Sequence, residues 1–402
     1  MGPVEHVSVT GAGIVCPIGS GASAYWDGIL SGRHRFAAIP GCDHLPGSRM
    51  WAAVPDDFLD GLELPAEWLR NADRFTQYAV ASAAQALAMG ELQGPPRDTA
   101  VLIGNTMGGL PLFAQSQMQL IEQPRHITPK LMALVIPNMA AARICLAWGL
   151  RGRQLTVSTA CASSLDAIGL AAQWIERGEV ECALAGGVET LLAPVVYASL
   201  ERAGALSQSR DARCAARPFD VERDGFAMGD GGGVLLLEST RHAEARGARI
   251  LARIRGYASM SEAHHLTSPE PSGEYEAEVM RAALSDAACG VEVIFAHATG
   301  TPAGDIAELR AINRVFPDAC PVVTSIRGQL GHSMAAAGVM SAVAGLYGMR
   351  DSLVPATLGT RRVEPEARFD VVLDAPRRKH YDAFLVNAFG FGGQNASLVL
   401  SR

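Results

Sequence analysis

The stretch Leu155-Thr156-Val157-Ser158-Thr159-Ala160-Cys161-Ala162-Ser163-Ser164-Leu165 is the part of the chain from which the fold can first be read. Its first residues are β-prone and predict a strand, whereas residues 166–175 carry apolar side chains at helical spacing. Cys161 therefore lies at a turn from a strand into a helix. A thiol at such a turn faces the free N–H groups and the positive dipole end of the helix, which favour the thiolate. Cys161 is a candidate nucleophile, and the alternative is a small buried structural cysteine.

Strand-like and helix-like segments alternate along the rest of the chain. Apolar residues recur at helical spacing in some segments and form short β-prone runs in others, while residues 34–65 are rich in Pro, Gly and Asp, which indicates a loop. In chain order the segments are strand 7–10, helix 25–30, helix 74–89, strand 100–104, helix 139–148, strand 182–185, strand 233–238, helix 241–246, strand 250–257, strand 293–296, strand 321–325, helix 335–349 and strand 396–400. This alternation predicts a layered α/β fold in which helices cover the sheets.

A boundary near residue 245 divides the chain, because the alternation begins again there after a short charged helix. We expect residues 1–245 to form an N-terminal half that carries Cys161. Residues 246–402 are expected to form a C-terminal half that carries two histidines and a glycine-aromatic loop. No low-complexity linker separates the halves, so we expect them to pack as one body.

Composition and charge narrow the class of protein. The chain has 402 residues, 49% hydrophobic and 19% charged, which is typical of a compact globular protein. A net charge of -7 gives no global basic field for nucleic acid or an anionic membrane. The eight cysteines are scattered without metal-ligand spacing, which indicates a reducing compartment and no metal site. With no signal-like start and no membrane-spanning apolar run, we expect a cytoplasmic protein.

Three further stretches lie where α/β folds place their functional residues, at the C-terminal ends of strands. His297 follows the strand predicted at 293–296, and His332 follows the strand at 321–325, just before a helix. The third stretch, residues 387–395, is a loop rich in glycine and phenylalanine. Each histidine alone is more often structural. One thiol with two imidazoles, however, suits acyl transfer followed by stabilisation of a carbonyl oxygen.

Taken together, these stretches resemble the β-ketoacyl-acyl carrier protein synthases of the thiolase superfamily. The resemblance covers nearly the whole chain, in order and at the spacing of that family. The segments that carry it are 9–11, 159–164, 217–226, 229–231, 263–269, 297–308, 331–338 and 387–395.

The resemblance implies a duplicated αβαβα fold in five layers and a decarboxylative Claisen condensation. Cys161 would take the acyl chain as a thioester, with the backbone N–H groups of Cys161 and Phe391 as its oxyanion hole. His297 and His332 would hold the malonyl thioester, assist loss of CO2 and stabilise the enolate. The resemblance implies no cofactor, because the acyl carrier protein supplies the phosphopantetheine arm.

Further residues take roles by the same resemblance. Supporting residues are Arg327, Glu308, Thr299 and Thr301; Phe389 and Phe391 would gate the pocket, and Met107 would line the acyl channel. Arg327 stands where most members have lysine, and we expect it to pair with Glu308 in a changed geometry. Ala298 replaces the usual glycine beside the first histidine, Gln394 a common threonine, and residues 152–154, Gly-Arg-Gln, a common Gly-Pro-Asn. These departures favour a specialised polyketide-type ketosynthase over routine fatty-acid elongation.

The implied partners are an acidic acyl carrier protein and a second subunit, in a homodimer or in a heterodimer with a chain-length-factor-like protein. Because the chain is acidic overall, docking needs local cations. The candidates are Arg70, Arg74, Arg125, Lys130 and Arg202. Two alternatives to the condensing enzyme remain: a non-catalytic subunit of the chain-length-factor type, and an acyltransferase that uses Cys161 without condensation.

Overall fold

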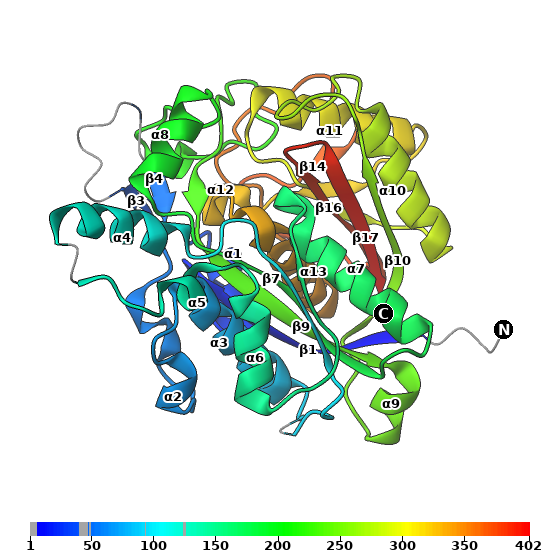
Figure 1. The fold of residues 1–402 in the computed structure, drawn as a ribbon. Helices are drawn as coiled ribbons and strands as arrows, with labels where there is room; N and C mark the ends of the chain where they lie inside the picture. The colour runs from blue at the N-terminus through cyan, green and yellow to red at the C-terminus, as the bar shows by residue number, and fades with distance from the viewer. Residues whose placement is uncertain (1–5, 40–46, 48–49, 93, 124–125) are drawn as a thin grey trace.

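The computed structural model describes residues 6–39, 47, 50–92, 94–123 and 126–402. Its strands form two mixed sheets joined edge to edge, with helices on the outer faces and between them (Figure 1). Within these ranges no helix has the length and apolarity needed to cross a bilayer.

The N-terminal sheet has five main strands, β1 (Val7–Cys16), β5 (Ala100–Gly104), β6 (Gln154–Val157), β7 (Cys182–Glu189) and β9 (Gly231–Ser239). Their order across the sheet is β6-β5-β7-β9-β1. Strand β5 runs parallel to β6 and β7, whereas β9 runs antiparallel to both of its neighbours.

The C-terminal sheet repeats this topology. Its strands are β10 (Ala252–Ser261), β11 (Val293–Phe295), β12 (Val322–Thr324), β16 (Ala383–Gly390) and β17 (Gln394–Ser401), with the short β14 (Asp370–Val371) beyond β12. If the five main strands of each half are numbered along the chain, both sheets have the order 3-2-4-5-1 with the same strand directions. Three residue pairs between β1 and β10 join the sheets. The predicted duplicated thiolase-like α/β fold is confirmed.

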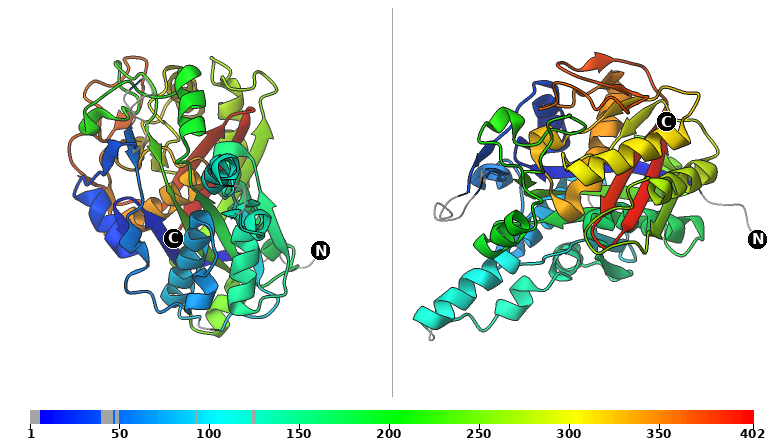
Figure 2. Two further views of the ribbon diagram at one scale, coloured as in Figure 1. Left: turned by 60° about the vertical axis from the view of Figure 1, so that its left-hand side comes forward. Right: turned by 90° about the horizontal axis from the view of Figure 1, so that it is seen from above.

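The two sheets and their helices stack in the layers helix, sheet, helix, sheet, helix (Figure 2), with a hydrophobic core on the outer side of each sheet and one between the sheets. Helices α3 (Arg74–Met89) and α6 (Met139–Trp148) cover the outer face of the N-terminal sheet. Helices α10 (Glu274–Ala287) and α11 (Pro302–Val315) cover the outer face of the other. Between the sheets lie α7 (Ser163–Glu176) and α13 (Ala337–Asp351), and the first thirteen residues of α13 are all buried, as expected for a helix apolar on every side.

The two central helices bring their N-termini together. A side chain at Gly338 of α13 would come within 2.6 Å of Leu165 of α7, so the helices meet at that glycine. The hydroxyl of Ser164 accepts a hydrogen bond from the backbone N–H of Val339 at 3.1 Å. One 3₁₀ turn precedes each helix, 160–162 before α7 and 334–336 before α13. The start of each half's central helix therefore faces the same region.

Several predicted elements agree with the structure residue for residue, namely α3, β5 and α6. The prediction of a loop over 34–65 is wrong in part. Strand β3 (Phe36–Ala38) pairs with β4 (Met50–Ala52), and β4 pairs with β8 (Met228–Gly229). Each of these strands is too short to show a periodicity, and β8 is distant in the sequence.

The remaining helices and strands are short except for α4, which has 13 residues. They are β2 (Gly19–Ser20), α1 (Ala22–Leu30), α2 (Ala66–Leu69), α4 (Leu110–Glu122), α5 (Leu131–Val135), α8 (Pro194–Arg202), α9 (Thr240–Ala245), α12 (Arg327–Leu330), β13 (Leu353–Val354) and β15 (Arg377–Arg378).

Candidate active site

Cys161 lies between the end of β6 and the start of α7, in the first 3₁₀ turn. The turn is braced by Ser163, whose hydroxyl donates to the carbonyl of Ala160 at 2.6 Å and accepts from the N–H of Thr159 at 2.9 Å. Ala160 takes a left-handed backbone conformation with φ of 49°. A non-glycine residue adopts this conformation only where its surroundings impose it, as at functional turns. The local structure therefore holds the Cys161 thiol in one buried position.

His332 comes to this thiol from the other half of the chain. Its Nε2 lies 3.0 Å from the sulfur of Cys161, although the residues are 171 positions apart. Its backbone is tied to the strand region near β8, because its N–H donates to the carbonyl of Ala227 at 2.8 Å and its carbonyl accepts from Gly229 at 3.1 Å. The ring of Phe226 packs edge-on at 5.2 Å between ring centres.

His297 completes the constellation from the end of β11. Its ring meets that of His332 edge to face, with ring centres 5.2 Å apart. The carboxylate of Glu308 fixes its backbone by accepting hydrogen bonds from the N–H groups of His297 at 2.9 Å and Ala298 at 2.7 Å. The three groups named from the sequence thus lie together, with ligand-type atoms within 4.8 Å of one another.

Burial sets the protonation states of this site. It lowers the pKa of His332 to about 3 and that of His297 well below its usual range, and the cation of Arg327 lowers both further. Both imidazoles are therefore neutral and can donate a hydrogen bond. Burial also raises the pKa of the Cys161 thiol to about 12, although Arg327 and nearby backbone N–H groups oppose it. Cys161 is therefore a thiol at rest. The sequence analysis favoured a thiolate, and the structure corrects this because burial raises the pKa more than the helix dipole lowers it.

The same three groups are of the types that bind zinc, because thiolate and imidazole are zinc ligands. A ligating histidine normally donates its second ring nitrogen to a carboxylate or carbonyl. The Nδ1 atoms of His297 and His332 have no hydrogen-bond partner in the described part of the chain. The arrangement therefore fits a thiol with two neutral imidazoles better than a metal centre.

The β16–β17 hairpin brings Phe391 to the turn that carries Cys161, where the sequence analysis expects an oxyanion hole. The backbone N–H groups of Phe391 and of Cys161 lower the pKa of the Cys161 thiol, against the larger effect of burial. Gly390 allows this approach, since a Cβ there would lie 2.9 Å from the backbone nitrogen of Cys161. Phe389 is buried with its ring centre 6.1 Å from that of His297, while Phe391 is 41% exposed.

A cavity of about 380 Å³ opens onto the thiol and both histidines. Its wall includes the sequence-predicted Thr299, Thr301, Phe389 and Phe391. It does not include Met107, which is 36% exposed, so the structure of the single chain gives no support for Met107 as a lining residue.

Met334 and Glu276 are among the residues of this cavity that the sequence analysis missed. Met334 places its sulfur 3.8 Å from that of Cys161, and Glu276 reaches the wall from the first turn of α10. Only the position of Met334 two residues after His332 offered a signal for it. The local sequence around Glu276 gives no signal of its role, because an acidic residue on the exposed face of a helix has the same pattern of neighbours.

The expected pairing of Arg327 with Glu308 is not found between these two described residues. Arg327 is fully buried, and its Nη2 donates to the carbonyl of Ala337 at 3.1 Å and the hydroxyl of Ser341 at 3.4 Å. Glu308 instead holds the backbone of His297 and accepts from Asn387 at 3.0 Å. Arg327 therefore braces the start of α13 and acts on the histidines through its charge.

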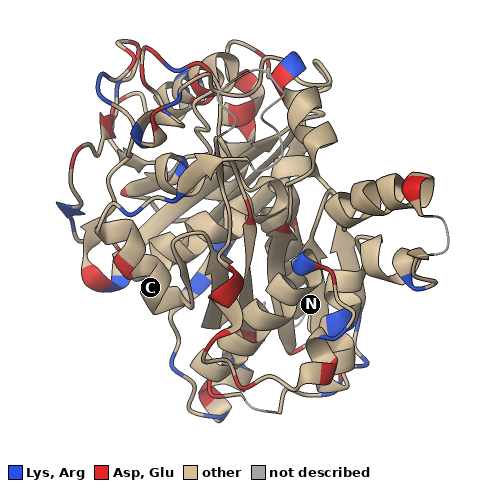
Figure 3. Ribbon diagram, turned by 90° about the vertical axis from the view of Figure 1, so that its left-hand side faces the viewer, with Lys and Arg blue, Asp and Glu red and all other residues tan. Residues whose placement is uncertain are grey.

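The candidate docking cations differ in their surroundings. Arg70, Lys130 and Arg202 are exposed, and Arg202 adjoins Ala203, which lines the cavity. Arg74 is engaged internally, with Asp56 at 2.7 Å and the hydroxyl of Tyr78 at 2.7 Å, so it is a poor docking residue. Arg125 lies outside the described residues. Basic and acidic positions are interspersed over the face shown in Figure 3.

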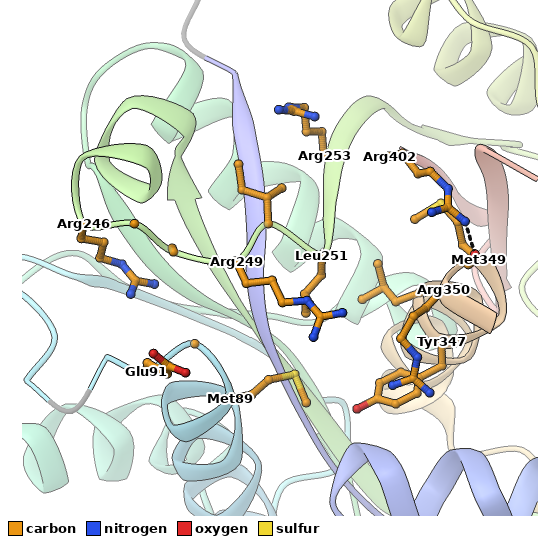
Figure 4. Close-up of a pocket in the computed structure, with 15 residues that line it drawn as sticks. Met89, Glu91, Arg246, Arg249, Leu251, Arg253, Tyr347, Met349, Arg350 and Arg402 are labelled. Carbon is orange, nitrogen blue, oxygen red and sulfur yellow. Dashed lines mark hydrogen bonds between the residues drawn. The ribbon is translucent and has the colours of Figure 1, made fainter.

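A larger cavity, of about 630 Å³, lies at the C-terminal ends of α3 and α13 (Figure 4). Five arginines surround it, but three of them already have acidic partners: Arg246 with Glu238, Arg350 with Asp351 and Arg402 with Asp382. It contains neither a thiol nor an imidazole, so we place the chemistry at Cys161.

Comparison with known proteins agrees with this site. The N-terminal domain of the β-ketoacyl synthases matches residues 4–243, and the C-terminal domain of the same family matches residues 251–361. A 3-oxoacyl-[acyl-carrier-protein] synthase 2 of Vibrio harveyi is 36% identical over 409 residues, which cover 99% of each chain. The enzyme of the same name from Staphylococcus aureus (strain COL) is 33% identical over 407 residues, 99% of this chain and 98% of its own.

Solved structures show the same fold over 99% of this chain and of their own. The ishigamide ketosynthase/chain length factor has a TM-score of 0.90 at 31% identity. A β-ketoacyl synthase from Burkholderia phymatum has a TM-score of 0.91 at 30% identity. A type II polyketide synthase acyl-carrier protein in complex with its ketosynthase bound to the hexaketide has a TM-score of 0.89 at 28% identity.

Proposed function

The chain belongs to the β-ketoacyl synthase family, and from the geometry of its site we propose that it condenses an acyl chain held on Cys161 with malonyl-acyl carrier protein. The product is a β-ketoacyl-acyl carrier protein, and CO2 is released. The observation that carries this proposal is the contact of Cys161 with His332 at 3.0 Å, beside a second neutral imidazole.

In the first half-reaction the sulfur of Cys161 attacks the thioester carbonyl of the incoming acyl group. The Nε2–H of His332 donates a hydrogen bond to the sulfur as the thiol loses its proton to solvent, and the departing thiolate of the carrier arm takes a proton from solvent. The backbone N–H groups of Cys161 and Phe391 hydrogen-bond the developing oxyanion. The result is an acyl thioester on Cys161 and a free carrier.

In the second half-reaction a malonyl thioester occupies the emptied arm site. Its C–C bond breaks, CO2 leaves, and the electron pair forms an enolate whose oxygen accepts hydrogen bonds from the neutral His297 and His332. The enolate carbon attacks the carbonyl of the acyl-Cys161 thioester and the C–S bond to Cys161 breaks. The sulfur leaves as a thiolate, which takes a proton from solvent to restore the resting thiol. Neutral imidazoles suit this role, because burial holds the pKa of each far below 7. No strong base is needed, since decarboxylation itself supplies the carbanion.

Incubation of the protein with acyl-acyl carrier protein and malonyl-acyl carrier protein tests this proposal. We expect an acyl adduct of Cys161 by intact mass, then CO2 and a β-ketoacyl product. The variant Cys161→Ala should lose the adduct, and His297→Ala should keep it but lose condensation. A wild-type protein without any adduct would indicate a non-catalytic subunit, and an adduct without CO2 would indicate an acyltransferase.

We propose two partners. An acyl carrier protein supplies both substrates on its own phosphopantetheine arm, so the protein needs no further cofactor, and exposed Arg202 beside the cavity is the best-placed docking cation. A second subunit covers the free edge of the N-terminal sheet at β6. Apolar side chains exposed there and on neighbouring helices are Phe113, Met118, Ile121, Met132, Leu146 and Leu155. A group of exposed apolar side chains on neighbouring elements is typical of a protein interface.

The projecting helices α4 and α5 carry part of this surface (Figure 2). We propose that the second subunit is a second copy of this chain or a chain-length-factor-like protein, in a specialised polyketide-type pathway of the cytoplasm. The replacements at Ala298 and Arg327 support the specialised pathway. Light scattering of the purified chain distinguishes the two: a dimer indicates self-association, and a monomer indicates that the partner is a different protein.

A further inference from the structure

Glu276 is a buried acid that no step of the proposed reaction uses. It belongs to the first turn of α10, is 2% exposed and lines the cavity that contains Cys161. Its Oε2 is fully buried without a hydrogen-bond partner, and the carboxyl group forms no hydrogen bond or ion pair with the described residues. A buried polar group left in this state costs stability, so its presence in a cavity wall needs an explanation.

The neighbouring acids show that this isolation is particular to Glu276. Glu308 accepts from the backbone of His297, and Asp305 accepts from the backbone N–H groups of Phe219 at 2.7 Å and Gly300 at 3.0 Å. Glu262 accepts from Asn395 at 2.8 Å. Each of these carboxyl groups has a hydrogen-bond partner, whereas Oε2 of Glu276 has none in the part of the chain that the structure describes.

The surroundings also determine the form in which Glu276 meets a ligand. Burial raises its pKa well above the usual range, and the negative charges of Glu308 and Glu262 raise it further. Glu276 is therefore a neutral carboxylic acid that offers one hydrogen-bond donor and an acceptor oxygen. This is the complement of an amide group, which offers an acceptor oxygen and an N–H donor.

We propose that Glu276 binds an amide of the thioester arm that delivers acyl and malonyl groups to Cys161. This inference rests on the proposed function, because it assumes that a carrier arm enters the cavity. Glu308 and Asp305, two of the acids whose charges act on Glu276, lie on α11, which directly follows Thr301, and Glu276 lines the same cavity as Thr299 and Thr301. Exposed residues of the cavity, such as Ser268 and Pro302, mark its mouth. The arm crosses this space in each half-reaction, and its amides are its hydrogen-bonding groups near the thiol.

The test compares two acyl donors with the same acyl chain. One is a pantetheine thioester, which carries two amides, and the other is a thioester of a simple alkanethiol, which carries none. The rate of Cys161 acylation by intact mass is measured for wild type, Glu276→Leu and Glu276→Gln. Glu274→Leu is the matched control, because Glu274 is an exposed acid in the same helical turn.

We expect Glu276→Leu to slow acylation by the pantetheine thioester about tenfold, the value of one hydrogen bond, and to leave the alkanethiol thioester unchanged. Glu276→Gln keeps a donor and an acceptor and should restore the pantetheine rate to within about threefold. Glu276→Ala should show the same selective loss as Glu276→Leu, which keeps the test open if leucine prevents folding. Glu274→Leu should behave as wild type.

Equal changes for both thioesters, or none, would overturn the inference, since they would mean that Glu276 does not contact the amides. A loss seen only with acyl chains that carry an amine or hydroxyl would also overturn it, in favour of a contact with the acyl group. If wild type forms no adduct with either thioester, the proposed function itself fails, which is a separate result. As a second readout, Glu276→Leu should raise Tm by about 1 to 4 °C, because it removes an unsatisfied buried group.

Discussion

The substitution Gly390→Ala tests the oxyanion hole through its narrowest contact. A Cβ at this position would lie 2.9 Å from the backbone nitrogen of Cys161 and 3.0 Å from the Cβ of Ala160. Real Cβ contacts are rarely closer than 3.4 Å, so the two backbones must separate by about 0.5 Å. The N–H of Phe391, one residue on, would move with the hairpin and away from the sulfur.

The size of the effect follows from this displacement. A misplacement of about 1 Å costs roughly a hundredfold in rate, and complete loss of one oxyanion donor costs about a hundredfold to a thousandfold. A shift of half that distance should slow acylation of Cys161 by about tenfold to a hundredfold. Overpacking of this kind also destabilises a protein by about 1–3 kcal/mol, which is a small part of the total for a large chain.

The acylation rate is measured by stopping the reaction at set times and determining the fraction of acyl-Cys161 by intact mass. Thermal unfolding shows whether the fold is kept. The control is Gly290→Ala, because a Cβ at Gly290 meets nothing within 4 Å. A Gly390→Ala protein that folds and acylates within about threefold of wild type would refute the placement of Phe391 as an oxyanion donor.

Three further predictions follow from the charges in the structure. His332 has a pKa of about 3 and the Cys161 thiol one of about 12, so neither group titrates between pH 5.5 and 8. The acylation rate should therefore not change with pH in this range. A tenfold rise in the rate per pH unit would indicate attack by a preformed thiolate instead. Arg327→Lys keeps the charge but loses the two hydrogen bonds that Nη2 donates to α13, so malonyl decarboxylation should fall about tenfold while acylation changes less. Unchanged decarboxylation would contradict this role. Arg202→Glu should raise KM severalfold for carrier-bound substrate only. The control Arg249→Glu, in the cavity of about 630 Å³, should leave that KM unchanged. Equal effects of Arg202→Glu on small thioesters would argue against docking.

The elements that could be predicted are those encoded by neighbours in the chain. The apolar spacing of 74–89 and 139–148 and the β-prone run of 100–104 agree with α3, α6 and β5 because helical spacing and strand alternation are local properties. The turn that presents Cys161 could be located for the same reason. Strands β3, β4 and β8 could not, since they form only by pairing with one another.

The two histidines could be named as candidates from their places after predicted strands, but their roles came from the resemblance of the whole chain to a family. Each follows a strand, but nothing local shows that His332 lies 3.0 Å from Cys161. That contact requires the two halves to pack with the starts of α7 and α13 together, which depends on a glycine at 338 and a small hydroxyl at Ser164.

The sequence by itself thus determined part of the order of elements, the layered α/β class and the residue types of the site, and its resemblance to a family implied the duplication. Only the tertiary structure decided how those residues behave. Burial converts Cys161 to a resting thiol and both histidines to neutral donors, because removing water penalises every charged form. Packing likewise directs Arg327 to α13 instead of Glu308 and leaves Glu276 without a partner in the cavity wall. Desolvation and orientation arise from all surrounding elements at once, so no single stretch of sequence contains them.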